Sequence, residues 1–304
     1  MSLKIVYGRA GTGKTSFCFN EIKKQIKTEK VYIITPEQFS FTAEKNLLTT
    51  IGNSSINAEV ITFQRIAYRV ITTTQGIKEE ILDDSAKQIL LYSILLDKKE
   101  NLRFLGNSEE NNELLFNTIT ELKKHNITTN KLQEGIEKTK DNYLKFKLQD
   151  INTIYSCYEE KLKNTYLDSD DLLTKIVGNI ENSNMFQNSI IYIDEFIGFT
   201  PQEYKIIEVL LSIAKEVIVT VSSDNILNTQ KNMFYSNNKT AQKLIKLANG
   251  INIPTETIFL EKTYRFKNDE IKKLEKNLYS FNYSKYEEEP KQITLKLLQN
   301  PYKE

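Results

Sequence analysis

Cysteine and histidine are nearly absent from this sequence of 304 residues, which contains only Cys18, Cys157 and His125. Zinc sites and iron–sulfur clusters need several such side chains close together, so the composition excludes both within this chain. We expect the two cysteines to pack as small hydrophobic side chains. His125 lies in a polar helix end, where we expect it to be solvated and to have no catalytic role.

Net charge and long apolar runs are also lacking. The chain has 41 basic and 40 acidic residues and a net charge of +1, so any contact with nucleic acid must come from a local patch. No apolar run is long enough to cross a bilayer, and the first residues lead directly into a strand pattern without room for a secretion signal. We therefore expect a cytoplasmic protein with no membrane partner.

A glycine-rich segment near the start matches the phosphate-binding pattern G-x-x-x-x-G-K-[ST] at every defined position. It reads Gly8-Arg9-Ala10-Gly11-Thr12-Gly13-Lys14-Thr15 and follows a short apolar run. Glycines allow backbone N–H groups to converge on phosphate oxygens, Lys14 would reach the β- and γ-phosphates, and the Thr15 hydroxyl would coordinate Mg²⁺. The segment predicts binding of a nucleoside triphosphate and Mg²⁺. A flexible turn is the alternative, disfavoured by the strand before the segment and the amphipathic helix after it.

Strand and helix patterns alternate in the first and last thirds of the chain, whereas residues 76–185 show only helical spacing. The expected strands are 3–7, 31–35, 58–62, 189–193, 216–221, 256–260 and 292–298. The expected helices outside the middle segment include 14–28, 41–50, 201–213, 238–248 and 268–279. This pattern predicts an α/β fold: a P-loop NTPase (RecA-like) parallel sheet, formed by residues 1–75 and 186–304, with an all-helical inserted subdomain over residues 76–185.

A second segment, which is acidic, completes the predicted nucleotide site. The apolar run Ile190–Ile193 ends in Asp194 and Glu195. We expect Asp194 to hold Mg²⁺, and Glu195, turned to the other side of the strand, to activate a water molecule. We place the loop and Asp194 at the carboxyl ends of adjacent strands. Arg265 follows a later strand and is a candidate to stabilise charge on a γ-phosphate, with a surface ion pair as the alternative.

The order of these motifs resembles the first core domain of superfamily-one helicases, and most of all the AddB family, the B subunits of bacterial AddAB helicase-nucleases. The resemblance depends on Gly8–Thr15, Thr35-Pro36-Glu37-Gln38-Phe39, Thr62-Phe63, Tyr166–Leu173, Ile193-Asp194-Glu195 and Tyr264-Arg265.

The resemblance implies an ATP-dependent helicase/deoxyribonuclease subunit that forms a heterodimer with an AddA-like motor and nuclease subunit. That complex would act on duplex DNA ends and single-stranded DNA in double-strand break resection and recombinational repair, and would recognise Chi. Residues near Gln38, Thr62 and Phe63 would face single-stranded DNA. The family's 4Fe-4S cluster belongs to a nuclease domain outside this chain. The expected strand 292–298 would lead into a second core domain, and without that domain the chain should hydrolyse ATP poorly.

Two departures from active superfamily-one motors concern the nucleotide site. The chain has only a few residues before the first strand, where motors carry an adenine-contacting glutamine motif, and it reads Thr220–Ile226 where they carry Gly-Asp-x-x-Gln. A non-catalytic scaffold gated by nucleotide is therefore the alternative function. A third candidate, a phosphotransferase of the thymidine kinase type, needs a cysteine-rich zinc lobe that two cysteines cannot supply.

Overall fold

The computed structural model describes residues 1–52, 57–74, 79–105, 111–163 and 165–266, together with residues 268, 270, 271, 273 and 274. The chain forms two compact units. The sheet unit contains Met1–Thr62 and Phe186–Gly198 and resumes at Leu210, and the helical unit contains Phe63–Met185 and Phe199–Val209. The predicted helix 268–279 lies largely, and the predicted strand 292–298 wholly, outside the described residues.

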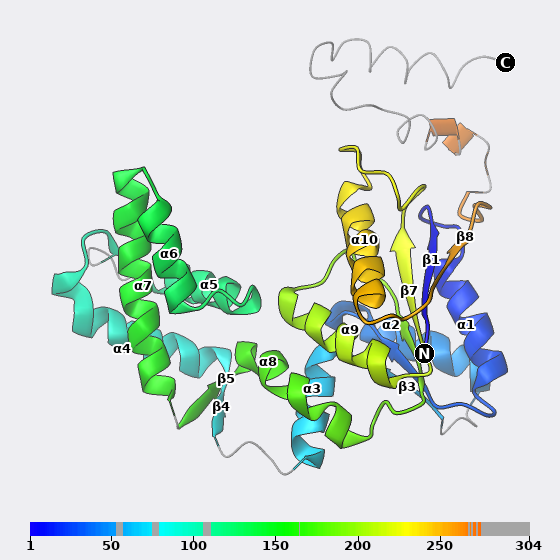
Figure 1. Cartoon of the computed structure of the whole chain (residues 1–304), viewed down its shortest axis with the longest axis horizontal. Coiled ribbons are helices and arrows are strands. Elements are labelled where there is room, and N and C mark those ends of the chain that lie inside the picture. Colours follow the sequence, from blue (N-terminus) through cyan, green and yellow to red (C-terminus); the bar gives the residue numbers. More distant parts are fainter. Residues whose placement is uncertain are drawn as a thin grey trace. The chain divides into compact units, whose positions relative to one another are not determined.

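A parallel sheet of six strands forms the centre of the sheet unit, in the order β3-β2-β6-β7-β1-β8 (Figure 1). Its strands are β1 (Leu3–Gly8), β2 (Val31–Ile34), β3 (Ala58–Ile61), β6 (Ile190–Ile193), β7 (Glu216–Ser222) and β8 (Thr255–Phe259). β2 and β6 consist only of Val, Ile and Tyr and are buried along their whole length, as expected of central strands covered on both faces. The prediction of an α/β fold with a parallel sheet is confirmed.

Helices cover the sheet because each presents an apolar stripe to it. α1 (Lys14–Gln25) and α2 (Glu37–Ile51) pack side chains such as Phe19 and Leu47 against one face, in a cluster with Ile33 and Tyr192. α10 (Tyr235–Gly250) lies against β1, β7 and β8. Cys18 is buried in the α1 cluster, which raises the pKa of its thiol, so it behaves as the predicted small hydrophobic side chain.

The start of α9 (Pro201–Ile213) shows how local sequence sets a helix boundary. The Thr200 hydroxyl accepts the N–H of Glu203 at 3.2 Å, and the Glu203 carboxylate accepts the N–H of Thr200 at 2.7 Å. This reciprocal capping box, with proline at the first helical position, satisfies N–H groups that the helix itself cannot pair. The predicted start of this helix is confirmed.

Helices dominate the helical unit, and those between Asp84 and Leu162 share an apolar core, which includes Leu91, Ile119 and Ile154. Its elements are α3 (Phe63–Thr73), β4 (Glu80–Leu82), α4 (Asp84–Lys98), α5 (Asn111–Lys124), α6 (Thr129–Lys138), α7 (Asn142–Leu162), β5 (Tyr166–Asp168) and α8 (Leu172–Ile176). Cys157 packs partly buried against this core, and His125 is exposed, both as predicted. None of the described helices has the length and apolar character to cross a bilayer.

The prediction that residues 76–185 are all-helical is wrong at one place. β4 and β5 pair in parallel, with Glu80 opposite Tyr166 and Leu82 opposite Asp168. Three-residue strands are too short to show an alternating pattern, and their partners lie far apart in the sequence. Local spacing therefore gives no sign of this small sheet.

A buried ionic network follows β5 in the helical unit. The Lys87 ammonium lies 3.0 Å from Asp168, and the Lys123 ammonium lies 2.5 Å from Asp171 and 3.5 Å from Asp168. Asp168 also accepts a hydrogen bond from the Tyr158 hydroxyl at 2.9 Å. Burial alone would raise the pKa of Asp168, but the two ammonium groups outweigh it and hold the pKa of this carboxyl below its ordinary value. The acidic residues of Tyr166–Leu173 therefore join α4 and α5 through ion pairs and α7 through the hydrogen bond from Tyr158.

Replacing Lys123 by methionine should lower the free energy of unfolding by about 3 kcal/mol, because Asp171 would lose its ammonium partner and the buried Asp168 would keep only Lys87. Lys175→Met is the matched control, since Lys175 pairs with Glu79 on a more exposed surface and should cost less than about 1 kcal/mol. Urea unfolding of both variants measures the difference. Equal losses would show that the network does not stabilise the unit.

Candidate functional site

Close packing explains the glycines of the loop between β1 and α1. Gly11 and Gly13 have φ angles of 79° and 83°, in the left-handed region that favours glycine. A Cβ atom added at Gly8 would lie 2.5 Å from the carbonyl oxygen of Leu260, and one added at Gly11 would lie 2.3 Å from the Cβ of Arg265. The segment that follows β8 therefore packs directly against the loop.

Lys14 begins α1 and lies in the pocket that the loop encloses. Its ammonium donates hydrogen bonds to the carbonyl oxygens of Gly8 and Arg9, each at 3.0 Å. Burial lowers the pKa of Lys14, although the carboxylates of Asp194 and Glu195 oppose the shift. The Arg9 side chain pairs with Asp224, with Nη2 2.8 Å from Oδ2. The Lys14 ammonium is therefore hydrogen-bonded to the loop backbone while it feels the charge of the acidic pair.

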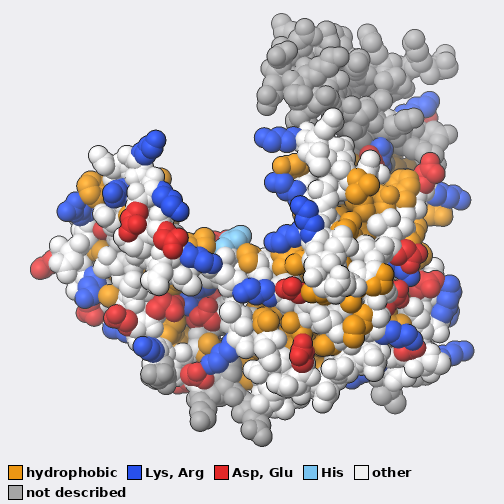
Figure 2. Space-filling view, in the orientation of Figure 1, with side chains coloured by type: hydrophobic (Ala, Val, Ile, Leu, Met, Phe, Trp, Pro, Cys, Tyr) orange, Lys and Arg blue, Asp and Glu red, His pale blue; other side chains and the backbone are white. Residues whose placement is uncertain are grey.

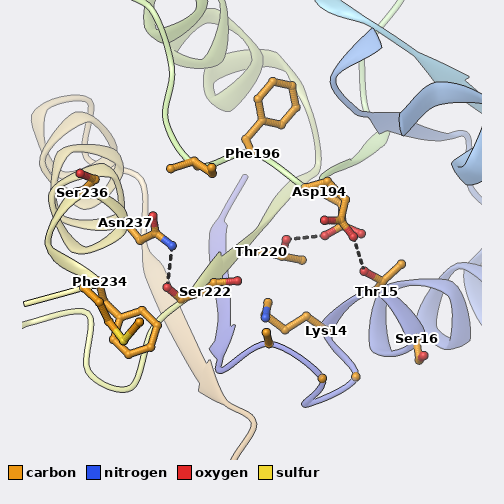
Figure 3. Close-up of a pocket in the computed structure, with 16 residues that line it drawn as sticks. Lys14, Thr15, Ser16, Asp194, Phe196, Thr220, Ser222, Phe234, Ser236 and Asn237 are labelled. Carbon is orange, nitrogen blue, oxygen red and sulfur yellow. Dashed lines mark hydrogen bonds between the residues drawn. The ribbon is translucent and has the colours of Figure 1, made fainter. Parts of the chain in front are cut away.

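Asp194 and Glu195 both line this pocket (Figure 3). Asp194 is 4% exposed and accepts a hydrogen bond from the Thr220 hydroxyl. Glu195 accepts one from the Thr15 hydroxyl at 3.2 Å. Strand alternation predicts that Glu195 turns away from Asp194, but this expectation is wrong because β6 ends at Ile193 and Glu195 has a φ of 67°, which redirects the chain. Burial and the nearby Asp194 raise the pKa of Glu195.

β7 separates the two strands that carry the loop and the acidic pair, so the expectation of adjacent strands is also wrong. β7 contributes Thr220 and Ser222 to the pocket, and α10 contributes Asn237, whose amide donates to the Ser222 carbonyl at 2.7 Å. The pocket has a volume of about 720 Å³. Sequence reasoning named none of Thr220, Ser222 and Asn237 as site residues, although it singled out Thr220–Ile226 as the segment where motors carry Gly-Asp-x-x-Gln.

Arg265 lies beside the loop but outside the residues that line the pocket. Its aliphatic carbons pack against Gly11, and its guanidinium lies 6.0 Å from the ring centre of Phe266. Tyr264, one residue earlier, donates its N–H to the carbonyl of Gly11 at 2.8 Å. The arrangement brings Arg265 to the loop without aiming its charge at Lys14 or Asp194.

The three residues proposed to face DNA differ in exposure. Gln38 is exposed in the first turn of α2. Thr62 is 2% exposed and donates its hydroxyl to Glu37 within the sheet unit. Phe63, in the helical unit, is 5% exposed and packs its ring 6.3 Å from that of Phe199. Only Gln38 therefore has a side chain on the surface.

The oxygen ligands in the pocket fit magnesium. Within the part of the chain that the structure describes, no group of three or more His, Cys, Asp or Glu side chains could hold a metal ion by itself. Magnesium differs from metals that need such a cage, because it binds through one or two protein oxygens, with phosphates and water completing the octahedron. Thr15, Asp194 and Glu195 place oxygen atoms of that kind at the mouth of the loop.

Comparison with known proteins identifies the family. The family model described as ADDB, N-terminal matches residues 5–275. The chain belongs to the AddB N-terminal family. It is 35% identical over its whole length to a protein of Clostridium tetani, 38% to one of Clostridium acetobutylicum and 36% to one of a Thermoanaerobacter species.

Each of these AddB relatives is named as the B subunit of an ATP-dependent helicase/deoxyribonuclease. The chain spans only 27–28% of the length of these relatives. The resemblance to AddB seen in the motif order is thus confirmed for the N-terminal region that the chain represents.

Substituting Gly11 by alanine should lower the free energy of unfolding by about 2 kcal/mol, because the new methyl group meets Arg265 and the backbone is left-handed. Gly135→Ala is the control. Gly135 lies in α6 with no atom within 4 Å of an added Cβ, and alanine there should raise stability by about 0.5–1 kcal/mol. Urea unfolding curves measure both, and a loss at Gly135 as large as that at Gly11 would contradict the packing argument.

Proposed function

We propose that this chain is the nucleotide-binding, DNA-engaging part of an AddB-type helicase-nuclease subunit, with a P-loop NTPase core. One observation carries the proposal: Lys14, Thr15, Asp194 and Glu195 lie in one pocket at the carboxyl edge of a parallel sheet. Ligands of α/β proteins bind at this edge, and the N-terminus of α1 adds its positive dipole end.

Each pocket residue has a distinct role in this proposal. Lys14 neutralises charge on the β- and γ-phosphates, while Thr15 and Asp194 hold the magnesium ion, which screens the charge of the transferred phosphoryl group. Thr220 fixes the orientation of the Asp194 carboxylate through its hydroxyl. Glu195 acts as the general base toward water, a role that suits its raised pKa. Gly8–Gly13 supply backbone N–H groups to the phosphates.

The names of the relatives support a partner protein. Because each relative is the B subunit of its enzyme, a second subunit is expected, and we propose an AddA-like motor and nuclease in a cytoplasmic heterodimer. The complex would process duplex ends, hold single-stranded DNA and respond to Chi during double-strand break resection and recombinational repair. Gln38, on an exposed turn, is the surface residue through which the sheet unit would contact DNA.

A nucleotide-gated scaffold is the second candidate function, and two observations favour it. The bend after β7 places Asp224 in an ion pair with Arg9. Among the described residues, no glutamine lines the pocket. The guanidinium of Arg265 lies over Phe266 and not in the pocket. Under this alternative, nucleotide would bind without being hydrolysed.

Lys14→Ala should weaken the binding of Mg·ATP to this chain by about tenfold to a hundredfold, because it removes a charge-assisted contact to phosphate. Lys24→Ala is the matched control, since Lys24 lies on the exposed side of the same helix. Isothermal titration measures both affinities. Equal affinities for the two variants would show that the loop does not bind the triphosphate.

The variant Glu195→Gln distinguishes the two candidate functions, an ATP-hydrolysing enzyme and a nucleotide-gated scaffold. The variant should bind Mg·ATP as tightly as the parent, because glutamine keeps the size of the side chain and its acceptor toward Thr15. We would test it in the full-length heterodimer whose partner carries an inactivated phosphate loop, so that the remaining ATP turnover belongs to this subunit. If this subunit is an enzyme, Glu195→Gln should lower the ATP turnover of that complex by about a hundredfold or more. No measurable turnover in the parent complex would support the scaffold instead.

A further inference from the structure

Aromatic and basic side chains alternate on one surface of the helical unit, at the N-terminal end of α7. The cluster consists of Arg103, Phe104, Tyr143, Phe146 and Lys147, and we call it the α7 platform. Tyr143 is 65% and Phe146 38% exposed, although large apolar rings are usually buried. Figure 2 shows hydrophobic, basic and acidic side chains side by side over this end of the unit.

The rings and cations of the α7 platform are ordered against one another. Phe104 and Tyr143 meet edge to face, with ring centres 5.1 Å apart and planes at 87°. The Lys147 ammonium lies 5.4 Å from the centre of the Phe104 ring, and the Arg103 guanidinium lies 4.7 Å from that of Phe146. Both distances are typical of cation–π contacts. The platform therefore presents aromatic surface and positive charge within one small area.

A buried carboxylate holds the platform in place. Asp150, which is 4% exposed, accepts the backbone N–H groups of Arg103, Phe104 and Leu105 at 3.2, 2.6 and 3.0 Å. These three bonds hold the backbone of Arg103, Phe104 and Leu105 in place. Side chains held on a fixed backbone lose less entropy when a ligand binds, so this anchor prepares the platform for contact.

The charged groups around the α7 platform indicate which class of partner it fits. Asp150 is buried beneath backbone N–H groups, and Asp141 caps α7 by accepting the N–H of Tyr143 at 2.9 Å, so both carboxylates already have N–H donors. Arg103 and Lys147 place two cationic groups directly beside the rings. Single-stranded nucleic acid combines phosphates that pair with cations and unpaired bases that stack on aromatic rings. An apolar protein partner would match the rings but not the cations.

We propose that the α7 platform is a binding site for single-stranded nucleic acid. A base stacks on the exposed ring of Tyr143, and the flanking phosphates pair with Arg103 and Lys147. The site lies wholly within the helical unit and uses no residue of the nucleotide pocket, so it stands or falls independently of ATP binding.

The test compares Tyr143→Ala with Tyr143→Phe in this chain, by fluorescence anisotropy of a labelled oligo(dT). Alanine should weaken binding roughly tenfold, while phenylalanine keeps the ring and the affinity. Thermal unfolding checks that both variants fold, and Mg·ATP titration, which neither variant should change, reports separately on the nucleotide pocket. Unchanged oligo(dT) binding by Tyr143→Ala would overturn the proposal, as would an equal loss in both variants.

Charge and base recognition are separated by two further measurements. Lys147→Ala should weaken oligo(dT) binding severalfold, whereas Lys161→Ala, at the other end of α7, should not. Heparin has the anionic charge without bases, so Tyr143→Ala should leave heparin binding unchanged. A loss for heparin as large as that for oligo(dT), or tighter binding of duplex than of single strands at the platform, would assign the surface to polyanions or duplexes and refute the proposal.

Discussion

The parallel register of β6, β7 and β1 is the constraint on which the candidate site depends. Parallel strands end at the same edge of a sheet, so the loop after β1 and the carboxylates after β6 meet there although about 180 residues separate them in sequence. Thr220 on the intervening strand joins the two halves by donating its hydroxyl to Asp194. A shift of one residue in this register would turn Thr220 to the opposite face and leave a buried carboxylate without its donor.

Close packing at the loop adds a second constraint. Gly11 meets the backbone N–H of Tyr264 and the side chain of Arg265, so the segment after β8 supports the loop from outside the pocket. The same contact keeps the Arg265 guanidinium over Phe266. A change in the backbone at Gly11 would therefore have to displace the Arg265 side chain, which lies directly against it.

Sequence predicts those features of this chain that depend on local chemistry. The glycine loop, the capping box at Thr200 and the buried strand before Asp194 can each be recognised from a short residue pattern. Features that depend on distant pairing escaped prediction. The pairing of β4 with β5 has no local pattern, Thr220 resembles any β-branched strand residue, and the left-handed backbone at Glu195 is set by the end of β6. The orientation of Arg265 depends on a contact with Gly11, which spacing along the chain cannot show.

The two units place their partly buried charged residues in different settings. The helical unit buries Lys87 and Lys123 against the acidic residues after β5, whereas the sheet unit leaves Lys14 and its acidic pair around a pocket of about 720 Å³. Loss of one partner would leave a buried charge unpaired in the first unit, whereas the charges around the pocket of the second are the basis of the proposed nucleotide site.

A crystal structure with Mg²⁺ and a non-hydrolysable ATP analogue tests this account most directly. We predict that the Lys14 ammonium contacts the β- and γ-phosphates and that the metal lies between Thr15 and Asp194. An analogue bound elsewhere, with Lys14 still bonded to the carbonyls of Gly8 and Arg9, would contradict it.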